Sequence, residues 1–143
     1  MGKRFWICGL VVSFAALLLT FVIHAFLLGP DYAALGPMYR SADVGARYVG
    51  WLLLAHGLVG FAMTWIFAQG VDRGRATLRQ GLRFGLAMAL FSTVPGSLLQ
   101  YAVQPLPGAL VARQVVLGTL AMLLLGMLLA WLQPRREALP ALR

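Results

Sequence analysis

The sequence predicts an all-α integral membrane protein: an antiparallel bundle of four transmembrane helices with both termini in the cytoplasm. Four apolar runs of 21 to 24 residues carry this prediction, and none of them contains Asp or Glu. A helix needs about 20 residues, at a rise of about 1.5 Å each, to cross the hydrocarbon core of a bilayer. The composition agrees, because 143 residues that are 61 % hydrophobic and 11 % charged have too little polar surface for a soluble domain.

The runs divide the chain, a single transmembrane domain over residues 1–143, into spans and connections. The spans are expected at residues 5–28, 49–69, 82–104 and 109–132. The connections are two outer loops at 29–48 and 105–108, a cytoplasmic loop at 70–81 and a cytoplasmic tail at 133–143. The first run follows Lys3-Arg4, as in a signal peptide, but it exceeds the usual apolar region of about 7–15 residues. We therefore expect it to remain as a span.

Basic residues set the sidedness, because Lys and Arg concentrate on the cytoplasmic side of membrane proteins. Three arginines border the outer loops: Arg40, Arg47 and Arg113. The other nine basic residues border the opposite ends of the spans: Lys3, Arg4, Arg73, Arg75, Arg79, Arg83, Arg135, Arg136 and Arg143. This bias predicts a multi-pass membrane protein with both termini in the cytoplasm. The net charge of +8 then indicates attraction to anionic lipid head groups rather than to nucleic acid.

Each span carries small residues at steps of three and four, which places them on one helix face, here called the seam. Small residues let membrane helices approach closely, so we expect the seams to pack together while large Leu, Val and Phe residues face lipid. The seams are Gly9, Ser13, Ala16, Thr20 and His24; His56, Gly60, Thr64 and Ala68; Gly81, Gly85, Ala89, Ser92, Gly96 and Gln100; and Gln114, Gly118, Ala121 or Met122, Gly126 and Ala130.

Polar side chains lie at similar depth in the outer half of all four spans, and polar groups inside a membrane indicate a functional site. The candidate site consists of His24, His56, Gln100 and Gln114, all on the seams and so expected to face the interior. One interpretation is that the two histidines bind haem b through its iron, or a copper or zinc ion. Another is a pocket for a small molecule, a lipid head group or a quinone. A third is that these side chains hydrogen-bond one another as cross-links between helices.

Arg113 and the remaining ionisable residues limit the chemistry. Arg113 is expected either to contact an anionic head group or to extend its guanidinium toward the interface. The four carboxylates all lie in loops or the tail, which argues against proton-coupled export, and no Ser-His-Asp, HExxH or phosphate-binding glycine motif is present. A single cysteine, Cys8, excludes an intramolecular disulfide.

The stretch from His24 through Tyr32 and Tyr39-Arg40 to the segment 101–108 resembles a family of small bacterial proteins with four transmembrane helices. The resemblance implies the architecture and a place in the bacterial inner (cytoplasmic) membrane, and it implies no activity. We expect a non-enzymatic binding or complex-assembly protein, with membrane lipids, other membrane proteins or a second copy as partners. The alternative is a cofactor- or ligand-binding protein, with one haem in a redox version, whose site surrounds His24 and His56.

Overall fold

The computed structural model describes residues 2–38, 42–70 and 77–133, and within these residues the chain is all-helical. Four helical segments are long and apolar enough to cross a membrane: Lys3–Leu27, Val49–Gly70, Leu78–Val103 and Gly108–Leu132. The prediction of an all-helical chain with four membrane-length helices is therefore confirmed. The third segment begins earlier than expected, because Thr77 caps its first turn by accepting a hydrogen bond from the Gln80 N–H at 3.2 Å.

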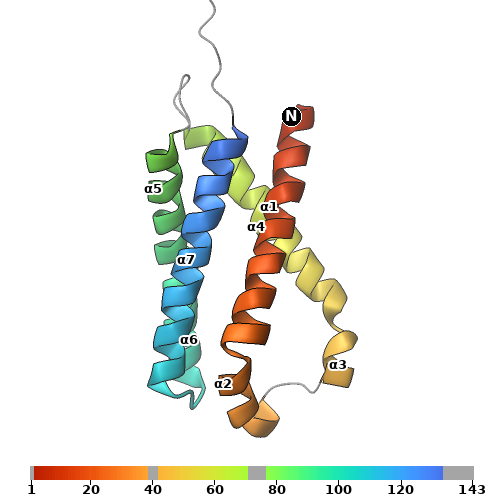
Figure 1. Cartoon of the computed structure of the whole chain (residues 1–143), viewed down its shortest axis with the longest axis vertical. Coiled ribbons are helices and arrows are strands. Elements are labelled where there is room, and N and C mark those ends of the chain that lie inside the picture. Colours follow the sequence, from red (N-terminus) through yellow and green to blue (C-terminus); the bar gives the residue numbers. More distant parts are fainter. Residues whose placement is uncertain (1, 39–41, 71–76, 134–143) are drawn as a thin grey trace, which may run out of the picture.

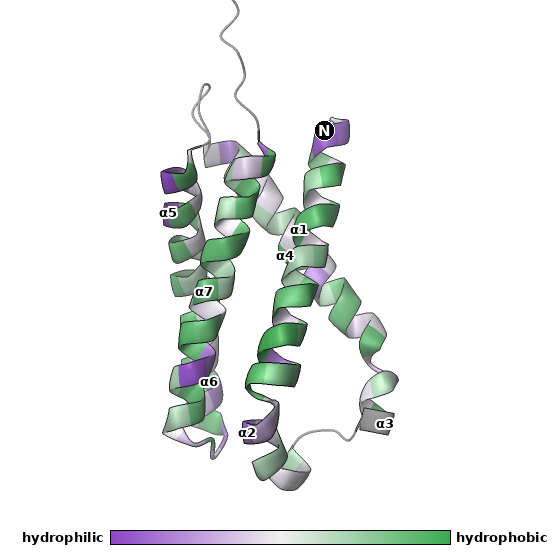
Figure 2. Ribbon diagram, viewed as in Figure 1, coloured by the Kyte–Doolittle hydropathy of each residue, from purple (hydrophilic) through white to green (hydrophobic). Residues whose placement is uncertain are grey.

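Two of the four segments are composite, since each contains a π-helical turn (Figure 1). The elements are α1 (Lys3–Phe21), η1 (Val22–Leu27), α2 (Gly29–Ala34), η2 (Gly36–Met38), α3 (Ala42–Ala46), α4 (Val49–Gly70), α5 (Leu78–Met88), η3 (Ala89–Thr93), α6 (Val94–Val103) and α7 (Gly108–Leu132). Figure 2 shows hydrophobic residues along most of the long helices and hydrophilic ones near their ends. Six of the basic residues used to predict the sidedness lie outside the described residues, at positions 40, 73, 75, 135, 136 and 143.

The long helices pack as two pairs, α1 with α4 and α5 with α7, and α1 also contacts α7 (Figure 1). We call the end at which α1 and α5 begin the α1 end, and the end that carries α2 and α3 the α2 end. The larger core cluster joins α1, α4 and α7; its buried members are Val12, Ala16, Met63, Phe67, Leu125, Leu129 and Ala130. A second cluster, Ile23, Leu28 and Leu110, lies toward the α2 end.

Glycines make the closest approaches between paired helices, as the seams predicted. A Cβ added at Gly60 would lie 2.6 Å from the Ser13 Cα, and one added at Gly85 would lie 2.8 Å from the Leu123 Cα. Gly81 and Gly126 face each other across the α5–α7 contact in the same way. The small-residue interpretation is therefore confirmed toward the α1 end of the bundle.

Toward the α2 end the seam prediction is wrong for spans one and three. His24, Ser92, Gly96 and Gln100 are exposed rather than interior. The reason is the π-helical turn that precedes or contains them, because an i→i+5 bond holds an extra residue and rotates the subsequent residues around the helix axis. In η1 the Leu28 N–H donates to the Ile23 carbonyl at 2.8 Å, so Ile23 and Leu28 become the buried residues.

In span three the same rotation makes Thr93, rather than Ser92, the residue that contacts α7. Ala89 is fully buried. Thr93, four residues later, packs against Gly118 of α7, where a Cβ added to the glycine would lie 2.5 Å from the Thr93 Cγ2. Pro95 stands in the first turn of α6, directly after the π-helical turn η3.

Large side chains also fill the core, contrary to the expectation that they would all face lipid. Leu28, Leu125, Leu129 and Val12 are fully buried. Glycine seams bring backbones together at a few levels only, and the space between those levels is filled by larger side chains, as close packing requires.

Candidate functional site

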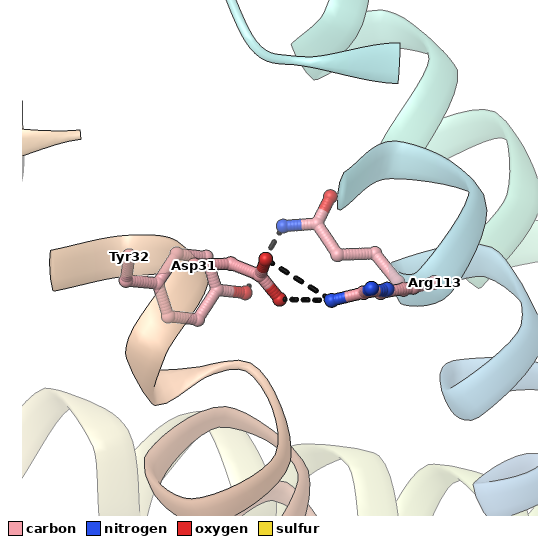
Figure 3. A network of polar contacts seen from close by, with 4 residues as sticks. Asp31, Tyr32 and Arg113 are labelled. Carbon is pink, nitrogen blue, oxygen red and sulfur yellow. Dashed lines mark hydrogen bonds and ion pairs between the residues drawn. The ribbon is translucent and has the colours of Figure 1, made fainter. Parts of the chain in front are cut away.

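At the α2 end of the bundle, the short helix α2 follows span one directly. Leu28 is fully buried against Leu110 of α7, and its carbonyl accepts a hydrogen bond from the Tyr32 N–H at 3.0 Å. Pro30 lies in the first turn of α2, a position that tolerates its missing N–H. These local contacts direct Asp31 and Tyr32 toward α7 (Figure 3).

A chain of hydrogen bonds connects span one, α2 and span four through the Tyr32 hydroxyl. The Gln114 amide Nε2 donates to the Tyr32 Oη at 3.0 Å, and the His24 Nδ1 lies 2.7 Å from the same oxygen. The imidazole of His24 also stacks on the Tyr32 ring, with centroids 5.7 Å apart and planes 12° from parallel. The Tyr32 hydroxyl can accept from the amide and still either donate to Nδ1 or accept from an Nδ1–H, so both neutral tautomers of His24 fit this geometry.

An ion pair lies beside this chain. The Arg113 Nη1 donates to both carboxylate oxygens of Asp31, at 2.8 Å and 3.1 Å (Figure 3). The side chains are 62 % and 30 % exposed, so the pair contributes about 0.2–1 kcal/mol in the manner of exposed ion pairs. Arg113, expected at an anionic head group or at the interface, thus has a protein carboxylate as its partner. We refer to His24, Asp31, Tyr32, Arg113 and Gln114 together as the clasp.

His56 lies apart from the clasp and links α4 to α1. Its Nδ1 lies 2.7 Å from the Leu52 carbonyl oxygen, and its Nε2 lies 2.8 Å from the Thr20 Oγ1. Since a carbonyl only accepts, Nδ1 carries a proton, and in the neutral imidazole the Thr20 hydroxyl donates to Nε2. Both imidazole nitrogens of His56 are therefore hydrogen-bonded, and neither shares a partner with His24.

Gln100 is the second predicted site residue outside the clasp. It is exposed on α6, and its side chain forms no hydrogen bond with the described residues. Of the four residues proposed from sequence, the structure joins His24 and Gln114 through Tyr32 and separates His56 and Gln100 from them. The rotation introduced by η3 explains the position of Gln100.

One polar atom of the clasp lacks a partner. The Gln114 side chain is 9 % exposed, and its Oε1 is buried without a hydrogen bond among the described residues. The Tyr32 hydroxyl serves one end of the amide, so rotating the amide by 180° would only transfer the unpaired state to its nitrogen. A buried polar group without a partner costs about 1–3 kcal/mol. The Gln114 Oε1 can therefore accept a hydrogen bond from one further donor.

Sequence reasoning missed Asp31, Tyr32 and Thr20 as partners. The available signal was a pair of complementary groups: a carboxylate and a phenol follow span one directly, and an arginine and a glutamine stand at the start of span four. The described residues contain no group of three or more His, Cys, Asp or Glu side chains arranged to hold a metal ion. Comparison with protein-family models, with curated proteins and with solved structures gives no match.

Proposed function

We propose that this chain is a non-enzymatic, multi-pass protein of the bacterial cytoplasmic membrane that acts in binding or complex assembly. In this proposal the four helices alternate in direction and both termini are cytoplasmic, which is supported by the distribution of Lys and Arg. The partner is a transmembrane helix that carries small and hydrogen-bonding residues of its own. It packs on the outward face of α6.

The observation that carries the proposal is the exposure of Gly96 and Gln100 on that face. A Cβ added at Gly96 would meet nothing within 4 Å, and the Gln100 side chain is exposed one turn further along α6. An amide directed toward lipid gains by hydrogen-bonding a neighbouring helix, and a glycine one turn away lets that helix approach closely. Ser92, one turn before Gly96, is exposed on the same side, although its hydroxyl already donates to the Met88 carbonyl at 2.8 Å.

Gly96→Leu is expected to release the partner helix while leaving the fold intact, because the new side chain points into open space. The wild-type protein, solubilised from its native membrane in mild detergent, should run on native gels as a complex larger than the monomer. The variant should run as the monomer with an unchanged unfolding temperature. Gly50→Leu is the matched control, since a Cβ there also meets nothing within 4 Å but lies on α4. A monomeric wild type, or a complex that survives Gly96→Leu, contradicts the proposal.

A second candidate function is supported by the unpaired Oε1 of Gln114. A small molecule with a hydroxyl or another donor would satisfy that oxygen and bind between α2 and α7. His24 offers its Nε2, which has no hydrogen bond among the described residues, whereas His56 would have to release Thr20 to bind anything. One interpretation of the sequence was a haem held by both histidines, and this arrangement does not favour it.

Mass spectrometry of organic extracts of the purified protein tests this candidate. A donor-bearing ligand should be recovered from the wild type, lost in Gln114→Leu and retained in Gln100→Leu, a matched change at an exposed glutamine. Equal recovery from both variants would rule out the site. An absorption spectrum, oxidised and dithionite-reduced, belongs to the same experiment. A Soret band that disappears in His24→Ala and in His56→Ala would replace the small molecule with haem.

A further inference from the structure

The first two turns of α5 present basic and apolar side chains side by side at the α1 end. Arg79 and Arg83 are both exposed and lie one turn apart, which brings their side chains to one face. Leu78 and Leu82, at 60 % and 38 % exposure, flank them. Figure 2 shows this alternation as hydrophilic patches on α5 near the end at which α1 begins.

This face points away from the rest of the bundle. Gly81 and Gly85 are buried against the backbone of α7, and at about 100° per residue Arg79 and Arg83 lie on the opposite side of the helix. Neither arginine has a carboxylate partner among the described residues, where the Asp31–Arg113 pair lies at the other end. As far as the described residues extend, the two guanidinium groups are exposed and available to a ligand outside the bundle.

With Leu78 as the first residue of the span, Arg79 and Arg83 are expected near the boundary between head groups and acyl chains. Arg83 follows Leu78, the first residue of the span, by five residues, or about 7.5 Å of helix. An arginine side chain crosses such a depth by extending along apolar surface toward the head groups. No acidic residue stands in the first turn of α5, so no carboxylate of that turn offsets the charge of Arg79 near the positive end of the helix dipole.

We propose that Arg79 and Arg83 bind the phosphate of an anionic phospholipid, whose acyl chains lie along Leu78, Leu82 and Leu86. Guanidinium groups bind phosphate oxygens through paired hydrogen bonds, which a lysine ammonium does not reproduce. The exposed leucines explain why the ligand is a lipid rather than a free anion. A net negative head group is selected because a zwitterionic one carries its own cation to the site.

Binding of phosphatidylglycerol and phosphatidylcholine to the detergent-purified full chain, measured by native mass spectrometry, tests the proposal. The Arg79→Gln/Arg83→Gln variant should bind phosphatidylglycerol roughly 30-fold more weakly, at about fivefold per arginine. Lys3→Gln/Arg4→Gln is the matched control, because it removes the same charge from the start of α1 and should retain wild-type affinity. The wild type should prefer phosphatidylglycerol to phosphatidylcholine.

Three results would overturn the site. Equal losses in the two double variants would show a diffuse attraction to the whole basic end, and unchanged binding in both would remove the arginines from the interaction. Equal affinity for the two lipids would contradict recognition of a net negative head group. If the glutamine variant fails to fold, Arg79→Lys/Arg83→Lys keeps the charge, and it should still bind more weakly than the wild type.

Discussion

Gly85→Leu is expected to destabilise the protein by more than about 3 kcal/mol, beyond the usual cost of an overpacked side chain. The first added carbon would clash with the Met122 carbonyl oxygen and would lie 2.8 Å from the Leu123 Cα. Both are backbone atoms of α7, so no side-chain rotation relieves the clash and the two helices must separate. Gly81 and Gly126 make similar approaches within one turn, so the separation would also lose their contacts.

Unfolding of the purified variant in detergent, by temperature or by denaturant, measures this loss. Gly96→Leu is the control within the same span, because the same side chain there meets nothing within 4 Å and should leave stability unchanged. Gly60→Leu should behave like Gly85→Leu, since its Cβ would lie 2.6 Å from the Ser13 Cα on α1. If Gly85→Leu proves as stable as Gly96→Leu, the α5–α7 contact is not the close approach described.

The second large effect is expected at the clasp, where Tyr32→Phe and Gln114→Leu should differ although they break the same hydrogen bond. Tyr32→Phe removes the hydroxyl that serves both His24 and Gln114 and leaves both ends of a buried amide unpaired. We expect it to cost about 1–3 kcal/mol. Gln114→Leu removes the unpaired Oε1 together with the amide and leaves the Tyr32–His24 bond, so it should remain within about 1 kcal/mol of the wild type.

A double-mutant cycle of the two changes, read from unfolding free energies, completes the comparison. Adding Gln114→Leu to Tyr32→Phe should recover part of the lost stability, because the stranded amide is gone. A Gln114→Leu variant as destabilised as Tyr32→Phe would contradict an unpaired Oε1. It would mean that a water or ligand donates to this oxygen in the folded protein.

The candidate site was only partly accessible to prediction. The depth of His24 and Gln114 follows from their positions within the apolar runs, and the structure does join them through Tyr32. Tyr32 itself lies outside any span, and its direction depends on Leu28 packing against Leu110, a contact between residues far apart in the sequence. No local pattern specifies such a contact. The partners of His56 are Leu52 and Thr20 rather than the other predicted site residues.

The number of membrane-length helices was determined by the sequence alone, because the length and polarity of a run decide whether it suits hydrocarbon, whatever its neighbours are. The glycine approaches at Gly60 and Gly85 were likewise readable, since helical spacing holds within an uninterrupted α-helix. Only the tertiary structure decided which residues face inward beyond η1 and η3. One extra residue in a helical turn rotates every later residue of that helix, and its place is chosen by packing, as where Thr93 meets Gly118.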